Sequence, residues 1–376
     1  MIYHLLNYWI EGHYAYENPL FRGTVAILVG FMVVWALGPV VIRWLIRMKC
    51  GDIPDFDHKE LNELTRHKAD IPTMGGLLIL FGIASAVLLL ANLTVFYIHL
   101  AGFCMVWLGM LGFWDDWFKL LGKGKDNGRD GLKFYQKLLF QIGLGVLLGF
   151  FIYYRGQKAF QGQEIEYFRI FSLPFVKGDL GNPILLSVPV FIIVTMLVVA
   201  FTSNAVNLTD GMDGLASGCV AMCCLVFMLL TYAVGDERVA RYLQYTHIPE
   251  AGELAVLCGG MLGASLGFLW YNTAPAQVFM GDTGSLPLGG LIGFVAIVIR
   301  QELMLFIVGG VFVIEAASVM LQVGYFKATK GKRLFLIAPI HHHFHLKGWE
   351  EAQVVVRFWL LSALFAAIAL ATAKLR

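Results

Sequence analysis

Aspartates recur in short polar stretches that border long apolar runs. The stretch SNAVNLTDGMDGLASG, residues 203–218, holds two aspartates three residues apart, with an asparagine just before them. Two further stretches, GFWDDW and GDTGS, add an aspartate pair and a single aspartate. Carboxylates that repel one another are stable together mainly when a cation lies between them, and hard oxygen ligands suit Mg²⁺. The residues predicted to meet in this way are Asp115 and Asp116, Asp210 and Asp213, and Asp282.

Each acidic stretch also has an ordinary structural explanation when it is taken alone. An aspartate pair at the end of an apolar run can be interfacial polarity. NLTDGMDG can begin a helix, with Asp or Thr as the cap and Gly turning the chain, and GDTGS can be a turn followed by an N-cap. The functional interpretation therefore depends on whether several stretches meet at one place, and hence on the helices that carry them.

The composition is that of a polytopic membrane protein. The chain of 376 residues is 58% hydrophobic and only 14% charged, whereas a soluble domain is about 25% charged. A helix needs about 20 apolar residues to cross a bilayer. We expect one all-helical membrane domain over residues 1–376, since open sheet edges cannot face lipid. Ten candidate spans are expected at about 21–46, 74–94, 96–114, 134–153, 184–202, 212–234, 254–272, 285–300, 303–326 and 354–373.

The distribution of basic residues sets the expected orientation. Most of the 28 lysines and arginines lie in the loops after the first, third and ninth spans, and the positive-inside rule makes these loops cytoplasmic. Ten spans then place both termini outside. The external loop of about 154–183 contains the β-branched and aromatic stretch QEIEYFRIF, which predicts a short extracytoplasmic hairpin.

With this topology, five polar stretches share the cytoplasmic face. HKADIPTMGG, residues 67–76, and APIHHHFHLKGW, residues 338–349, join the three acidic ones. The histidine run lacks a Cys or H-E-x-x-H context for zinc, and its lysine-rich surroundings favour a phosphate or pyrophosphate group. Glu315 lies inside the ninth span, where a charge is costly in lipid, so it is expected to face the bundle interior; a purely structural hydrogen-bonding role is the alternative.

Acidic metal ligands, a basic and histidine-rich rim and a bilayer surface together favour phosphoryl transfer from a cytoplasmic nucleotide-type donor to a lipid acceptor. A secondary transporter is one alternative, but it would place its polar residues near the bilayer midplane. A structural protein is the other, but it has no need for so many carboxylates at one depth. No nucleic-acid partner is expected.

The motifs resemble those of the bacterial phospho-N-acetylmuramoyl-pentapeptide transferases, within the polyprenyl-phosphate N-acetylhexosamine-1-phosphate transferase superfamily. PTMGG, DD, NLTDGMDGLA, GDTGS and PIHHHFHLKGW match in order over about residues 20–373. The resemblance implies a Mg²⁺-dependent, multi-pass homodimer of the bacterial cytoplasmic membrane. It would transfer phospho-MurNAc-pentapeptide from UDP-MurNAc-pentapeptide to undecaprenyl phosphate, giving lipid I and UMP in peptidoglycan synthesis. The alternative is a polyprenyl-phosphate GlcNAc-1-phosphate transferase, whose histidine motif differs.

The resemblance also implies roles for single residues. Asp115, Asp116 and Asp282 match the catalytic acidic set, with Asp282 as the expected direct Mg²⁺ ligand, and Phe279 would stack on uracil. His345 stands where the family usually has glutamate, which puts a substrate-binding role of that side chain in doubt. The positions that match the substrate site are Lys68, Thr73, Asn204, Asn207, Asp210, Asp213, Phe279, Gln322, His341, His342 and His343.

Overall fold

The long apolar runs form helices that begin at polar residues or prolines. Helix α3, Pro19–Arg47, follows Asn18, whose Oδ1 accepts a hydrogen bond from the Leu20 backbone N–H at 2.8 Å. Asp236 caps the short helix α10, Glu237–Leu243, in the same way.

The structure is a computed structural model. The residues that it describes are 3, 14–48, 50–51, 68, 71–121, 131–159, 169–173 and 184–373.

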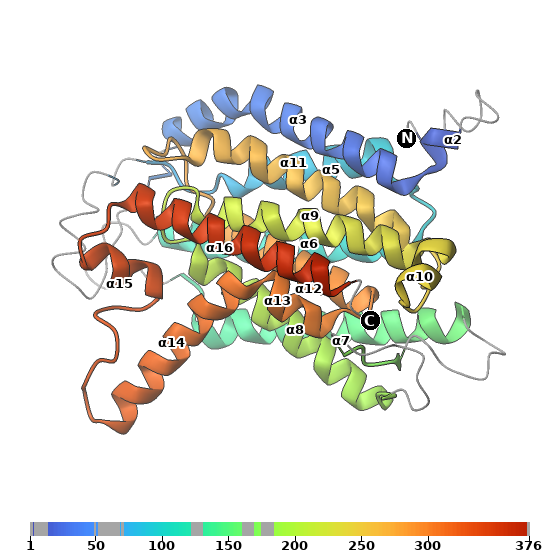
Figure 1. Ribbon diagram of the computed structural model, residues 1–376. Coiled ribbons are helices and arrows are strands. Elements are labelled where there is room, and N and C mark those ends of the chain that lie inside the picture. Colours follow the sequence, from blue (N-terminus) through green and yellow to red (C-terminus); the bar gives the residue numbers. More distant parts are fainter. Residues whose placement is uncertain are drawn as a thin grey trace.

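The helices pack side by side in one bundle, with α11 between α3 and α9 (Figure 1). Their bounds, in chain order, are α2 Tyr14–Glu17, α3 Pro19–Arg47, α5 Gly76–Leu90, α6 Phe96–Leu121, α7 Phe134–Ala159, α8 Val188–Thr209, α9 Leu215–Gly235, α10 Glu237–Leu243, the 3₁₀ turn η3 Ala251–Glu253, α11 Leu254–Asn272, α12 Asp282–Val298, α13 Glu302–Val308, α14 Gly310–Ala328, α15 Ile340–Leu346 and α16 Glu351–Thr372.

Every predicted span contains helix. Eight helices of the described chain are long and apolar enough to cross a membrane, and α5 and α12, with 15 and 17 residues, are apolar but shorter. The ninth predicted span is interrupted at Gly309, where α13 ends and α14 begins. The all-helical architecture is therefore confirmed, and the count of ten crossings stays a prediction.

The predicted extracytoplasmic hairpin lies largely outside the described residues. One antiparallel bridge joins Ile170 to Leu185, and two backbone hydrogen bonds of 2.8 and 3.0 Å flank it. The start of the predicted loop is helical, because α7 extends to Ala159. No β-strand forms among the residues that the structure describes, so the hairpin also stays a prediction.

Helices α3 and α11 approach each other closely because both present small residues. A Cβ atom at Gly259, Gly263 or Gly267 of α11 would lie closer than 3.0 Å to backbone atoms of α3. Gly23 and Gly30 of α3 face the α11 backbone in the same way. Small residues at such spacing let membrane helices pack by van der Waals contact.

We expect Gly263→Ala to lower the thermal stability of the purified protein, because the new methyl group meets the Ile27 backbone rather than a movable side chain. Overpacking of this kind typically costs about 1–3 kcal/mol. Gly102 of α6 is the matched control, because a Cβ there meets nothing within 4 Å, and alanine suits a helix interior better than glycine. The unfolding temperature should therefore fall for Gly263→Ala and rise for Gly102→Ala. Equal shifts of the unfolding temperature in the two variants would contradict the packing argument.

Helix α12 lies at the centre, and all its residues are buried. Two glycines allow neighbouring helices to reach its first turn. A Cβ at Gly112 of α6 would collide with the backbone of Asp282 and Thr283, and one at Gly76 of α5 would collide with Gly284. Close approach at these two points brings the end of α6 and the start of α5 against the start of α12.

The polar stretches gather at one end of the bundle. Helix α15 and the loops before α9 and α12 lie at the left in Figure 1, and α2 lies at the right. We call the left end the site end.

Candidate active site

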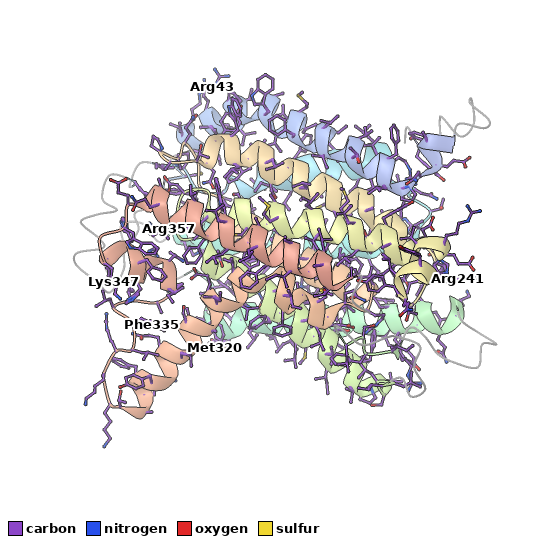
Figure 2. All side chains as sticks on the ribbon, in the orientation of Figure 1. Arg43, Arg241, Met320, Phe335, Lys347 and Arg357 are labelled. Atoms are coloured by element: carbon purple, nitrogen blue, oxygen red, sulfur yellow. The ribbon has the colours of Figure 1, made fainter. Side chains whose placement is uncertain are left out.

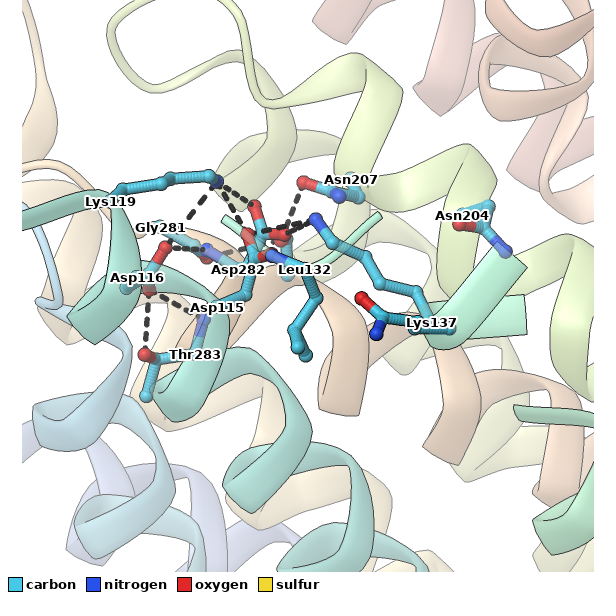
Figure 3. A network of polar contacts seen from close by, with 12 residues as sticks. Asp115, Asp116, Lys119, Leu132, Lys137, Asn204, Asn207, Gly281, Asp282 and Thr283 are labelled. Atoms are coloured by element: carbon cyan, nitrogen blue, oxygen red, sulfur yellow. Dashed lines mark hydrogen bonds and ion pairs between the residues drawn. The ribbon is translucent and has the colours of Figure 1, made fainter. Parts of the chain in front are cut away.

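Three carboxylates form a buried cluster at the site end. Asp115 and Asp116 come from the last turns of α6, and Asp282 is the first residue of α12. All three are buried, and their carboxylate oxygens lie within 4.8 Å of one another. The sequence-based prediction that DD and GDTGS meet is therefore confirmed, and we call these three residues the acidic cluster (Figure 3).

Asp116 caps helix α12 from outside the helix. Its Oδ1 accepts a hydrogen bond from the Asp282 backbone N–H at 3.1 Å, and its Oδ2 accepts from the Thr283 N–H at 2.9 Å and the Thr283 hydroxyl at 2.7 Å. These N–H groups have no partner within the helix. Gly281 has a φ of +71°, and a Cβ there would lie 2.6 Å from Asp116 Oδ2 and 2.9 Å from Thr73 Oγ1. Asp116 thus fixes the backbone that carries Asp282.

Two lysines join Asp115 to Asp282. Lys119 Nζ lies 2.7 Å from Asp115 Oδ2 and 3.3 Å from Asp282 Oδ1. Lys137 Nζ, from the first turns of α7, lies 2.8 Å from Asp115 Oδ2 and 2.6 Å from Asp282 Oδ2. Asp115 Oδ1 accepts from the Leu132 N–H at 2.7 Å. The sequence motifs did not single out either lysine, although the spacing of Asp115 and Lys119 places them on one helix face.

The end of α8 lies beside the acidic cluster. Asn207 Oδ1 accepts a hydrogen bond from the Ser285 hydroxyl of α12 at 3.1 Å. Asp210 follows α8, and its pKa is raised to about 8 by burial and by the negative charges of Asp282 and Asp116. Asn204 is set apart from the acidic cluster in Figure 3. Its amide donates to Gln141 Oε1 of α7 at 2.6 Å.

A second polar group, which we call the lysine centre, joins Lys68, Asp213 and Glu351. Lys68 Nζ lies 2.5 Å from Asp213 Oδ1 and 2.5 Å from Glu351 Oε1. The other Asp213 oxygen accepts from the Ala276 N–H at 3.0 Å. Lys68 Nζ also lies 5.9 Å from the centre of the Phe279 ring. Three predicted substrate residues therefore lie together, with Glu351 as a partner that the sequence analysis missed.

Asn272 links the start of α9 to the loop before α12. Its Oδ1 accepts from the Gly214 N–H at 3.0 Å and from the Ser217 hydroxyl at 3.2 Å. Its Nδ2 donates to the Val278 carbonyl at 2.9 Å. The sequence alone did not single out Asn272, because its contacts across two loops cannot be read from its position in the chain.

The histidine run forms helix α15, which contacts the Asp210–Asp213 loop. His341 Nδ1 lies 3.0 Å from Glu315 Oε2, and both side chains are fully buried, which confirms that Glu315 faces the interior. A Cβ at Gly211 would lie closer than 3.0 Å to His341 and 3.1 Å from His342 Nε2. Burial, together with His341, His345 and Lys68, holds the pKa of His342 well below its usual value, so His342 is neutral at pH 7.

Two predicted substrate residues stabilise the loop between α14 and α15, where Figure 2 labels Phe335. Gln322 Oε1 accepts from the Leu334 and Phe335 N–H groups at 3.0 and 2.9 Å. His343 Nδ1 accepts from the Leu336 N–H at 3.1 Å. His345, the departure from the family pattern, contacts the Trp349 carbonyl at 3.0 Å through Nδ1, which is a local contact at the end of α15.

Several known proteins are similar to this chain over its whole length. A protein from Desulfotalea psychrophila named phospho-N-acetylmuramoyl-pentapeptide-transferase is 44% identical, over 100% of both chains. Proteins of the same name from Desulfosudis oleivorans and Rickettsia canadensis are 40% and 41% identical, again over 100% of both chains. The chain belongs to the phospho-N-acetylmuramoyl-pentapeptide transferase family.

Two family patterns map onto the site end. Signature 1 of the phospho-N-acetylmuramoyl-pentapeptide transferases matches residues 68–80, which include Lys68 and Thr73. The broader pattern of glycosyl transferase family 4 matches residues 97–300, which carry the acidic cluster. The resemblance read from the motifs is therefore confirmed. Helix α15 and Glu351 lie outside both matches, so their place at the site rests on the geometry.

Proposed function

We propose that the protein transfers phospho-MurNAc-pentapeptide from UDP-MurNAc-pentapeptide to undecaprenyl phosphate, giving lipid I and UMP. Full-length relatives that carry the transferase name support this assignment. The observation that carries it is the buried acidic cluster, bridged by two lysines at the end of a membrane bundle. Such a site suits a diphosphate donor and a lipid-borne acceptor.

In the proposed reaction, an oxygen of the lipid phosphate attacks the sugar-linked phosphorus, and the bond from that phosphorus to the UMP oxygen breaks. The acceptor phosphate is largely ionised near neutral pH, so it needs little activation. We assign Asp115 to position it. Lys119 and Lys137 would counter the charge of the phosphate oxygens, which is where phosphoryl transfer needs electrostatic stabilisation.

The acidic cluster fits Mg²⁺ by its donor set. Three carboxylates face two ammonium groups, which leaves an excess of negative charge. Asp282 would be the direct ligand of the ion, whereas both Asp116 oxygens are already engaged by the first turn of α12. When bound, Mg²⁺ would neutralise the diphosphate and stabilise negative charge on the leaving phosphate.

The remaining predicted residues are assigned to the donor. Phe279 would stack on the uracil ring, beside Lys68 and its partner Asp213. Thr73 follows Pro72, whose carbonyl accepts a hydrogen bond from the Phe279 N–H at 2.8 Å. Asn207 accepts a hydrogen bond from Ser285 of α12, and Asp210 precedes Gly211, which lies against α15. Asn204, Gln322 and His343 are assigned supporting roles, because their described contacts hold neighbouring helices and loops.

Donor choice tests the proposed function against the sister branch. Purified protein should turn over UDP-MurNAc-pentapeptide with undecaprenyl phosphate and Mg²⁺, and show little or no turnover with UDP-GlcNAc. The histidine segment HHHFHLKGW motivates this expectation. Preferential use of UDP-GlcNAc would move the protein to the GlcNAc-1-phosphate transferases.

We further propose a homodimer in the bacterial cytoplasmic membrane, with ten crossings, the site end in the cytoplasm and both termini outside. The basic loops support this orientation. A cysteine introduced at Asp126 should react with an impermeant thiol reagent only from the cytoplasmic side, and one at Gln161 only from outside. The six native cysteines are buried and should give little background. The reverse pattern would contradict the orientation.

A further inference from the structure

The first residue of helix α16 reaches into the lysine centre. Glu351 Oε1 lies 2.5 Å from Lys68 Nζ and accepts a hydrogen bond from the Asp213 backbone N–H at 2.9 Å. Lys68 and Asp213 are 6% and 4% exposed, and the Glu351 side chain is 19% exposed. A single carboxylate oxygen therefore joins α16 to the segment before α5 and to the loop before α9.

The neighbouring glutamate shows that this contact is not a general property of the helix start. An acidic residue in a first turn is favoured by the unpaired N–H groups alone, and this would explain either glutamate. Glu350, however, is exposed and has no side-chain cap bond. Glu351 instead contacts two residues that are distant in sequence, so its contacts serve a different purpose from helix capping.

Glu351 restricts where the Lys68 ammonium can lie. With two carboxylates at 2.5 Å, the ammonium is held on both sides, at 5.9 Å from the centre of the Phe279 ring. The hydrogen bond to the Asp213 N–H also fixes the loop whose Asp213 Oδ2 binds Ala276. Loss of Glu351 would leave Lys68 with one carboxylate partner, and would leave the loop without its link to α16.

We infer that Glu351 is a positioning residue for the nucleotide donor: it holds Lys68 and the Asp213 loop in the arrangement that receives the nucleoside diphosphate. This inference rests on the proposal that Lys68, Asp213 and Phe279 line the donor site. Glu351 acts through these residues and is not assigned a contact with the reacting phosphates, because within the described part of the chain its contacts with Lys68 and the Asp213 N–H do not reach the acidic cluster.

The inference predicts a selective change in kinetics. A residue that shapes donor binding without taking part in the reaction should change the donor KM and leave kcat unaltered. Glu351→Gln keeps the shape but removes the charge that holds Lys68. Loss of a charge-assisted contact of this kind corresponds to about a tenfold rise in the donor KM. The acceptor KM and kcat should stay within about twofold of the wild type.

The experiment uses the full chain in lipid nanodiscs, with the kinetics of UDP-MurNAc-pentapeptide and undecaprenyl phosphate measured separately. Glu350→Gln is the matched control and should change neither KM. Glu351→Asp keeps the charge and should recover part of the donor affinity, and it also serves if Glu351→Gln folds poorly. An unchanged donor KM in Glu351→Gln, or a loss of kcat with both KM values constant, would overturn the inference.

Lys68→Met separates this inference from the proposal on which it rests. If Lys68→Met raises the donor KM and Glu351→Gln does not, Lys68 belongs to the donor site and the positioning role of Glu351 is wrong. If Lys68→Met leaves the donor KM unchanged, the assignment of the lysine centre to the donor is wrong, and the inference is overturned with it.

Discussion

Replacing Asp282 by asparagine is expected to lower turnover by about 10²–10³-fold or more while leaving the fold intact. The substitution keeps the shape of the side chain and removes the charge that faces Lys119 and Lys137. It should also remove the principal Mg²⁺ ligand of the proposed site. Turnover at saturating Mg²⁺ and thermal unfolding of the same preparation together measure the two parts of this expectation.

The alternative role of Asp282 as a helix cap makes the opposite prediction. Asparagine caps a helix about as well as aspartate, so a capping role would leave activity nearly normal. Asp236→Asn is a suitable control, because Asp236 caps α10 through its side chain, at 3.0 Å from the Arg238 and Val239 N–H groups. If Asp282→Asn kept more than about a tenth of wild-type turnover, the loss would be under about 1.4 kcal/mol and the ligand role would be contradicted.

Asp116→Asn is expected to lower both stability and turnover. Both Asp116 oxygens accept hydrogen bonds from the start of α12, and the asparagine NH₂ group would face one or more of these donors. Loss of such a cap typically costs about 0.5–2 kcal/mol. The displaced first turn of α12 would also move Asp282 away from Lys119 and Lys137, so turnover should fall even with Mg²⁺ in excess.

The measurement for Asp116→Asn is the unfolding temperature alongside turnover, compared with Asp282→Asn in one preparation series. We expect the Asp116 variant to be the less stable of the two. Equal stability of the two variants, with both inactive, would show that Asp116 does not maintain the start of α12 and would favour a direct role in the reaction.

Much of the architecture can be predicted from the apolar pattern, because membrane helices need long apolar runs. All ten runs contain helix, and the ninth alone is interrupted, at Gly309. A single glycine does not reveal such an interruption in advance, since glycine also occurs inside intact spans such as α11. The membrane orientation and the hairpin remain predictions from the sequence.

The acidic cluster was predictable because its members sit at the ends of apolar runs, but the division of roles within it was not. Asp115 forms ion pairs with two lysines at 2.7 and 2.8 Å, whereas Asp116 bonds to the start of α12 and has Lys119 only at 3.8 Å. That difference depends on the close approach of α6 to α12 at Gly112. Glu351 was missed for a similar reason, because its partners lie far away in sequence.

The burial of α12 also has a consequence for the order in which the chain assembles. The helices that contact it most, α6 and α8, and the further neighbours α5 and α9, all precede it in the chain. During synthesis, these four helices can therefore be in place before α12 leaves the ribosome. A nascent chain that ends before residue 282 would carry Asp115 and Asp116 without their third partner, so the acidic cluster would be complete only when this late helix has packed into the bundle.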